Sequence, residues 1–165
     1  MAFDAFLKID GIPGESMDNA HADWIEILSY SAGVSQTASA SASSGGGASS
    51  ERADFMDFSI VKALDKASPK LALACADGTH IGEVVIELCR AGGDKLKYME
   101  YKMTDCIISS HRPGGSSQGG ETLPLEEVSF NYGKIEWTYT QQKRADGSGG
   151  GNVAAGWNLE TNAKI

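Results

Sequence analysis

The stretch LEEVSFNYGKIEWTYTQQ, residues 125–142, decides the fold class because apolar and polar side chains alternate along it. Val128, Phe130 and Tyr132 share one face of its first half. The second half places Ile135, Trp137 and Tyr139 on one face and Glu136, Thr138 and Thr140 on the other. Gly133 either divides the run into two strands or marks a bulge within one. The pattern predicts sheet with one buried face.

Similar β patterns occur along most of the chain, separated by turns rich in glycine. We expect strands at residues 3–10, 24–30, 55–62, 81–90 and 95–110, with a closing strand near 157–159. In the run 55–62, Met56, Phe58 and Ile60 are expected to face one way. This spacing predicts a single domain, residues 1–165, built as a small β-barrel or β-sandwich.

One short helix is predicted from about Ser68 to Asp77. Ser68 is suited to the N-cap, Pro69 to the first helical position, and Gly78 to the end of the helix. A helix this short is not stable alone. We therefore expect its Leu71, Ala74 and Cys75 side to pack on the sheet.

A long extended loop, from about Val34 to Ala53, interrupts the β pattern with the tract SQTASASASSGGGASS, residues 35–50. A hairpin of this length reaches roughly 30 Å. One interpretation is a flexible surface loop. The other is an arm that contacts a neighbouring subunit, favoured by the alternating Ser and Ala residues and by the strands that hold both ends. The residues assigned to this inter-subunit arm are Thr37, Ser39, Ser41, Gly45, Gly46 and Gly47.

Composition excludes several classes of partner. The net charge is −8, whereas nucleic-acid binding requires clustered basic residues, so no nucleic acid is expected. No apolar stretch is long enough to span a membrane, and the N-terminus lacks a signal-peptide pattern. The three cysteines, Cys75, Cys89 and Cys106, are expected to be free, buried thiols. The protein is thus expected to be made in the cytoplasm.

Candidate catalytic groups do not form a convincing cluster. Glu126 and Glu127 are adjacent on a strand and point to opposite faces, and the acidic residues are expected to lie on solvated strand faces. His21, His80 and His111 are scattered, and with the cysteines they match no common zinc spacing or cysteine–histidine signature. The triple glycines at 45–47 and 149–151 lack the residues of a phosphate-binding loop. We expect no enzyme activity, no cofactor and no metal.

The tryptophans leave a different function open. Trp24, Trp137 and Trp157, with nearby aromatic residues, would suit a β-sandwich that binds carbohydrate, although aromatic residues at alternating strand positions more often form core or interface. A hydrolytic exported toxin is the other alternative, and it requires a nucleophile or acid pair that the sequence does not offer.

Several stretches together resemble the Hcp (haemolysin-coregulated protein) family, which forms the inner tube of the bacterial type VI secretion system. The matching stretches are FLKIDGIPGES at 6–16, His21, WIEI at 24–27, SYSAGVSQ at 29–36, FSIVKALDKASPKLALAC at 58–75, CRAGGDK at 89–95, LPLEEVSFNYGK at 123–134 and GWN at 156–158. The resemblance runs nearly from end to end.

The resemblance implies a small β-barrel of two packed antiparallel sheets with a helix at its side. It also implies a homohexameric ring that stacks into a tube. It implies further partners: a spike protein at the tip, a contractile sheath, and small effector proteins carried in the lumen. It also implies secretion by the type VI system without a signal peptide. On this basis Ser29 and Ser31 are expected to form part of the lumen wall.

Overall fold

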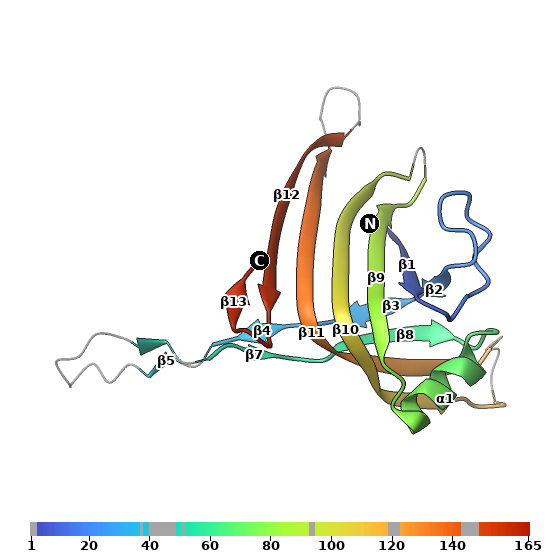
Figure 1. The fold of residues 1–165 in the computed structure, drawn as a ribbon. Helices are drawn as coiled ribbons and strands as arrows, with labels where there is room; N and C mark the ends of the chain where they lie inside the picture. The colour runs from blue at the N-terminus through green and yellow to red at the C-terminus, as the bar shows by residue number, and fades with distance from the viewer. Residues whose placement is uncertain are drawn as a thin grey trace.

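A computed structural model describes residues 3–36, 38–39, 49–50, 52–92, 95–118, 123–142 and 149–165 (Figure 1). Antiparallel strands dominate, and one helix lies at the side. In chain order the elements are β1 (Phe3–Ile9), β2 (Ile25–Ile27), β3 (Ser29–Ser31), β4 (Val34–Ser35), β5 (Ala38–Ser39), β6 (Ser49–Ser50), β7 (Asp54–Phe55), β8 (Phe58–Ala63), α1 (Ser68–Asp77), β9 (Ile81–Arg90), β10 (Lys97–Gly114), β11 (Leu125–Gln142), β12 (Gly149–Asn158) and β13 (Ala163–Lys164).

Two layers share the long strands β10 and β11. One layer has the order β13-β12-β11-β10-β9-β1-β2, and in the other β3 pairs with β8 and β8 pairs with the first half of β11. In Figure 1 the first layer stands upright while β3, β8 and the lower parts of β10 and β11 run across its base. The predicted architecture of two antiparallel sheets with one helix is confirmed, and the layers enclose the core as an open barrel.

Both long strands bend where they pass from one layer to the other. The pairs Thr104–Lys134 and Cys106–Tyr132 flank the bend without a change of register. Gly133 lies there because an added Cβ would lie 2.8 Å from Glu160 Oε1 and 3.3 Å from Asp105 Cβ. The sequence had suggested that Gly133 either divides the strand or marks a bulge, and it does neither. The register shifts of β10 and β11 lie elsewhere: between Ile108 and Ser110 against β11, between Lys97 and Met99 against β9, and between Thr140 and Gln142 against β12.

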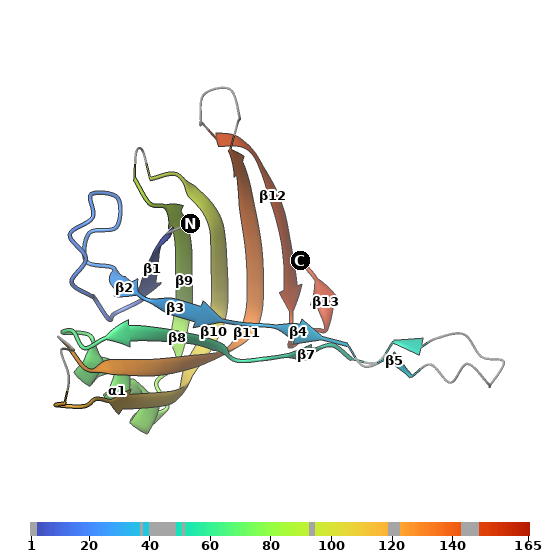
Figure 2. The same ribbon diagram turned by 180° about the vertical axis from the view of Figure 1, so that it is seen from behind.

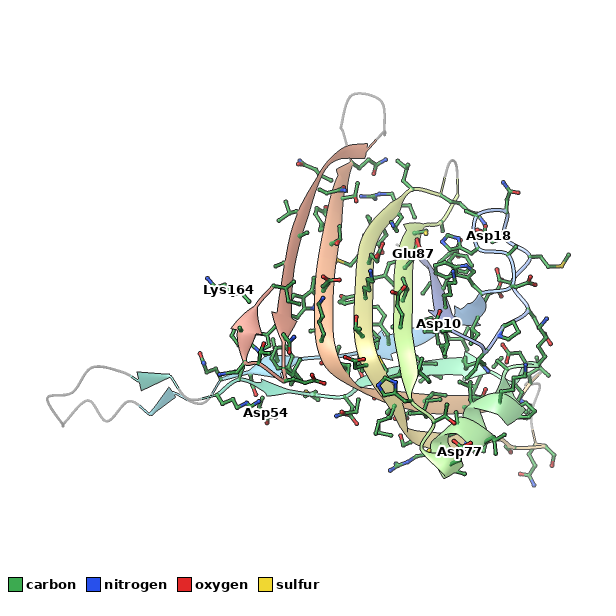
Figure 3. All side chains as sticks on the ribbon, viewed as in Figure 1. Asp10, Asp18, Asp54, Asp77, Glu87 and Lys164 are labelled. Atoms are coloured by element: carbon green, nitrogen blue, oxygen red, sulfur yellow. The ribbon has the colours of Figure 1, made fainter. Side chains whose placement is uncertain are left out.

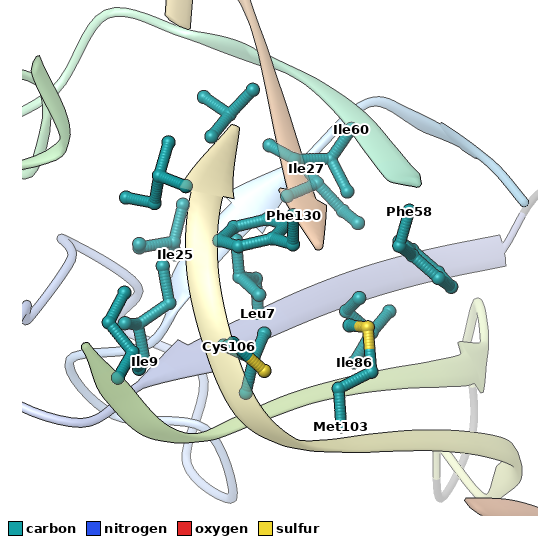
Figure 4. Packing of buried hydrophobic residues seen from close by; sticks show 14 of the residues in the cluster. Leu7, Ile9, Ile25, Ile27, Phe58, Ile60, Ile86, Met103, Cys106 and Phe130 are labelled. Atoms are coloured by element: carbon teal, nitrogen blue, oxygen red, sulfur yellow. The ribbon is translucent and has the colours of Figure 1, made fainter. Parts of the chain in front are cut away.

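The core fills the space between the two layers. Leu7, Ile25, Phe58, Ile60 and Phe130 are all fully buried in it (Figure 4). Helix α1 adds Leu71 and Ala74, as predicted, while Cys75 is only half-buried. The helix differs from the prediction at its start, because Ala67 is the N-cap and Ser68 is the first helical residue. The Ser68 hydroxyl is used elsewhere: it donates to Glu126 and accepts a hydrogen bond from the Asp65 amide.

Two predicted strands are each divided in the structure. The run 24–30 breaks at Leu28, because β2 pairs with β1 while β3 crosses to pair with β8. The run 55–62 becomes β7 and β8. Met56, expected to share the buried face of Phe58 and Ile60, is 62% exposed, so that expectation is wrong. In both cases the chain leaves one set of partners for another, which an alternating pattern does not reveal.

The long loop forms a hairpin in its described parts, since β4 pairs with β7 and β5 pairs with β6. Figure 2 shows β4 and β7 running away from the barrel toward β5. Ser39 lies in β5, opposite Ser49. Thr37, Ser41, Gly45, Gly46 and Gly47 lie outside the described residues. Within the described residues, the helix is too short and too polar to cross a membrane.

Candidate interaction surfaces

Serine side chains line the outer face of the β3–β8–β11–β10 layer. Ser29 and Ser31 are exposed, because Tyr30 between them turns inward to stack on Phe58 with ring centroids 5.8 Å apart. Residues that lie directly opposite each other on neighbouring strands share a face, so this face extends across the layer through the pairs Ser31–Ser59, Ser59–Ser129 and Ser129–Ser110. We call Ser29, Ser31, Ser59, Ser110 and Ser129 the serine face.

Hydrogen bonds order the polar groups of this face. The hydroxyl oxygens of Ser59 and Ser129 lie 2.8 Å apart. Beside them the Asp57 carboxylate accepts hydrogen bonds from the Ser109 hydroxyl at 2.6 Å and from the Asn131 amide at 3.0 Å. Ser31, one of the two residues predicted to line the lumen, therefore begins a row of serine hydroxyls that crosses the layer through Ser59 and the largely buried Ser129. Ser29, the other predicted residue, lies on the same face of β3 and is paired with Val61.

A second surface lies where β10, β11 and β12 extend past the barrel core. Register aligns Met99 with Tyr139 and Tyr139 with Val153 on the core-facing side of these strands. Tyr139 is 45% exposed and Val153 is 72% exposed. We call Met99, Trp137, Tyr139, Val153 and Ala155 the apolar extension. Its opposite side is polar and carries the ion pairs Lys97–Glu100, Lys102–Glu83 and Lys134–Glu136.

The base of the hairpin arm meets the apolar extension. Phe55 of β7 lies against Trp137, with ring centroids 6.4 Å apart, and against Tyr132 at the same separation. Nearby Val34 and Met56 are 54% and 62% exposed. A hollow of about 250 Å³ opens between the arm base and the extension, lined by Val34, Phe55, Met99, Tyr101 and Trp137, among others. Arm base and extension thus form one concave apolar surface.

A buried charged network ties α1 to the lower layer. Lys62 of β8 is fully buried and bonds to Glu126 of β11, to Asp65 at 2.9 Å and to Ser68 at 3.3 Å. His111 Nε2 lies 2.6 Å from the other oxygen of Glu126. Burial by itself raises the pKa of Glu126, but the hydrogen bonds from Lys62, Ser68 and His111 outweigh it and leave the pKa below its usual range.

The network corrects the expectation that the acidic strand residues are solvated, because Glu126 is 1% exposed. Strand alternation would have predicted this burial, because Lys62 follows Phe58 and Ile60, and Glu126 precedes Val128, at the two-residue spacing of inward-facing positions. Both charges therefore point inward, and the long-range pairing of β8 with β11 places Lys62 opposite Glu126.

A second cluster brings together His21, Asp18 and Cys89, which sequence reasoning left apart. His21 Nδ1 is 2.7 Å from Asp18 Oδ2, and its Nε2 is 4.0 Å from Cys89 Sγ and 3.5 Å from Glu87 Oε1. Figure 3 shows Asp18 and Glu87 on the same side of the barrel. Cys89 is fully buried, and burial raises the pKa of its thiol to about 11. A thiol that is buried and protonated does not serve as a nucleophile.

Metal binding has no support in the described residues. No set of three or more His, Cys, Asp or Glu side chains there is arranged to hold an ion. His80 is 64% exposed and pairs only loosely with Asp105, at 3.6 Å. The three cysteines are free; Cys89 and Cys106 are buried as predicted, whereas Cys75 is only partly buried.

The tryptophans do not form one carbohydrate-binding face. Trp137 and Trp157 share the core-facing side of the upright sheet, where Trp157 is paired with Ile135. Trp24 contacts His21, which stacks on Phe6, and Phe6 points away from the core residues Ala5 and Leu7. Trp24 therefore lies on the other side of the sheet.

Comparison with known proteins identifies relatives of the whole chain. Residues 6–139 match the family model described as type VI secretion system effector, Hcp. Protein hcp1 of Pseudomonas aeruginosa is 36% identical over 165 residues, covering 99% of both chains.

Solved structures agree with this assignment. A type six secretion system protein superposes with a TM-score of 0.93 at 33% identity, over 99% of this chain and 100% of the other. Hcp1 of Salmonella typhimurium superposes with a TM-score of 0.82 at 34% identity, over the full length of both chains. The chain belongs to the Hcp family of type VI secretion proteins.

Proposed function

We propose that the protein is a structural subunit of the type VI secretion tube. In this proposal copies of the chain close into a hexameric ring, rings stack into a tube, and effector proteins travel in the lumen. Spike and sheath proteins are the remaining partners, and no catalysis is required. The observation that carries the proposal is the far part of the apolar extension, where Tyr139 and Val153 are exposed within the described residues, while the arm base packs only on Trp137, through Phe55.

A sheet one layer thick with an exposed apolar face is stabilised when another protein surface covers that face. Burying apolar surface stabilises by about 25 cal/mol per Å², so large exposed side chains such as Tyr139 and Val153 favour association. The polar side of the same strands needs no such cover. A second copy is the expected occupant, because the family assignment implies self-assembly.

Free strand edges supply a route for that association. Within the described residues β3 pairs with β8 alone, and β10 beyond Cys106 pairs with β11 alone. These edges lie on opposite sides of the layer that carries the serine face. Copies joined edge to edge would continue this layer, as a head-to-tail interface in a closed ring requires. The serine face would then form a continuous wall, in keeping with the lumen assignment of Ser29 and Ser31.

A matched pair of variants on β12 tests the proposal. Val153→Asp places a charge on the apolar face, while Ala154→Asp places the same charge on the polar face one residue away. Light scattering with negative-stain images should give ring-shaped hexamers of the 17.4 kDa chain for wild type and for Ala154→Asp. Val153→Asp should be monomeric and folded. Rings formed equally by both variants would contradict the role of the extension, and a monomeric wild type would contradict self-assembly without a template.

The lumen and arm assignments have separate tests. Ser31→Trp should reduce effector retention while rings still form, and unchanged retention would remove Ser31 from the lumen wall. Deleting residues 38–48 should weaken assembly without unfolding the barrel, because the arm base is held by Phe55 packing and not by the arm itself.

A further inference from the structure

Residues 10–24 form a compact segment on the outer side of β1 and β9, and we call it the strap. Phe6 shows what the strap covers. Its side chain points away from Ala5 and Leu7, toward the outer side, yet it is only 4% exposed. His21 of the strap lies flat on the Phe6 ring, with centroids 4.1 Å apart and planes 4° apart.

The backbone of the strap is hydrogen-bonded to itself. Gly14 donates to Asp23, Asp23 donates to Ser16, and Ser16 donates to Trp24, at 2.7, 2.9 and 2.9 Å. Gly14 suits this turn because an added Cβ would lie 2.4 Å from the Trp24 carbonyl oxygen. The strap is therefore a small unit with its own internal structure.

The first residues of the strap belong to the barrel: the Asp10 amide donates to the Glu83 carbonyl at 3.4 Å, and Ile12 is 8% exposed and packs in the core. From Pro13 onward the strap is attached to the barrel largely through side chains. His21, 5% exposed, reaches Glu87 and Cys89 of β9, and the Asp18 carboxylate that orients it accepts a hydrogen bond from Lys95 at 3.1 Å. Elsewhere the Lys66 amide donates to Glu15 at 3.0 Å, and Lys8 lies 5.8 Å from the centre of the Trp24 ring. Among these contacts His21 alone enters the buried layer under the strap.

Residues with left-handed backbone stand at both ends of the strap. Gly11 has φ of 82° and Asp23 has φ of 65°. Such positions commonly end one structural unit and begin another, and segments joined mainly by side chains open at lower free energy than the core.

We propose that the strap from Pro13 onward is a latched lid: it opens as a unit while the barrel, with Ile12 in its core, stays folded, and the insertion of His21 between Phe6 and Trp24 is the latch. Opening uncovers Phe6 and the Cys89 thiol. The core thiol Cys106 stays covered, because it lies between the two layers of the barrel. This proposal does not depend on the proposed function.

Thiol labelling with N-ethylmaleimide tests the latch, with each modified cysteine identified by mass spectrometry. The half-buried Cys75 reports that the reagent is active, and the fully buried Cys106 reports global unfolding. His21→Ala should speed labelling of Cys89 by about tenfold or more while Cys106 labelling is unchanged. His80→Ala, which removes an exposed histidine outside the strap, should leave Cys89 labelling unchanged.

Two results would overturn the proposal: Cys89 labelling unaffected by His21→Ala, or Cys89 and Cys106 labelling accelerated together. If His21→Ala does not fold, Asp18→Asn replaces it, because this change keeps the ring stack and weakens the two contacts of the Asp18 carboxylate, with His21 and with Lys95. Asp18→Asn should give a smaller acceleration at Cys89 alone, and no acceleration would count against the latch.

Discussion

The two halves of β11 carry the same alternating pattern but have different surroundings. Before Gly133, Val128 and Phe130 are fully buried between the layers of the barrel. After it, Tyr139 on the same strand is 45% exposed, although its neighbours alternate in the same way. Alternation therefore identifies the apolar face of a strand, while the tertiary fold decides whether other residues cover that face.

The strongest test of this difference is Phe130→Ala. The substitution removes a fully buried aromatic ring from the core, so the free energy of unfolding should fall by about 4 kcal/mol. Urea denaturation followed by circular dichroism, at protein concentrations where the subunits are dissociated, measures the change.

Tyr139→Ala is the matched control in the other half of β11. Because Tyr139 is partly exposed within one subunit, its loss should change the free energy of unfolding by less than about 1 kcal/mol, while ring formation decreases. Similar losses of stability for both variants would mean that the two halves are equally covered within one subunit.

The next largest effect is expected for Lys62→Met. Removing Lys62 leaves the buried Glu126 carboxylate without its cation, so the free energy of unfolding should fall by about 3 kcal/mol. Lys134→Met is the control, because its pair with Glu136 is 3.8 Å long and partly exposed and should contribute less than about 0.5 kcal/mol. Equal losses of unfolding free energy for the two variants would contradict the claim that the buried pair contributes more than the partly exposed one.

A smaller effect is expected at the boundary between the halves. Gly133→Ala forces Glu160 to move and crowds Asp105, so it should cost about 1 to 2 kcal/mol of unfolding free energy. Gly114→Ala at the end of β10, where an added Cβ meets nothing within 4 Å, should be nearly neutral. A neutral Gly133→Ala would show that the bend does not need glycine.

The smallest effect concerns acid stability. The folded-state pKa of Glu126 lies below its ordinary value of 4.5, so its ionisation favours folding above that pH, and this contribution is lost as pH falls. Glu126→Gln should therefore flatten the acid side of a plot of unfolding free energy against pH. An unchanged slope for Glu126→Gln would contradict the lowered pKa of Glu126.

Local signals predicted much of the fold. Proline, glycine and good helix formers located α1, and alternation located β9 and the full length of β11. The predictions that were wrong share one cause: at these residues the chain changes its strand partner or a side chain bonds to a residue distant in sequence. Leu28 and Met56 sit where the chain leaves one neighbour for another, and Ser68 gives up the capping role to bond Glu126, far away in sequence.

The interaction surfaces were predicted less completely. Ser29 and Ser31 were named from family resemblance, but their continuation through Ser59, Ser129 and Ser110 depends on the register of four strands. The clustering of His21 with Asp18 and Cys89 also depends on how the strap folds back onto β9.

Residue spacing and local conformational preference were enough to determine the β class, the single helix and the apolar face of each long strand. Tertiary structure alone decided which apolar faces are covered, where β10 and β11 bend, and which charges meet inside the barrel. Those features arise from contacts between residues distant in sequence, as between Lys62 and Glu126, and a period-two pattern holds no information about such partners.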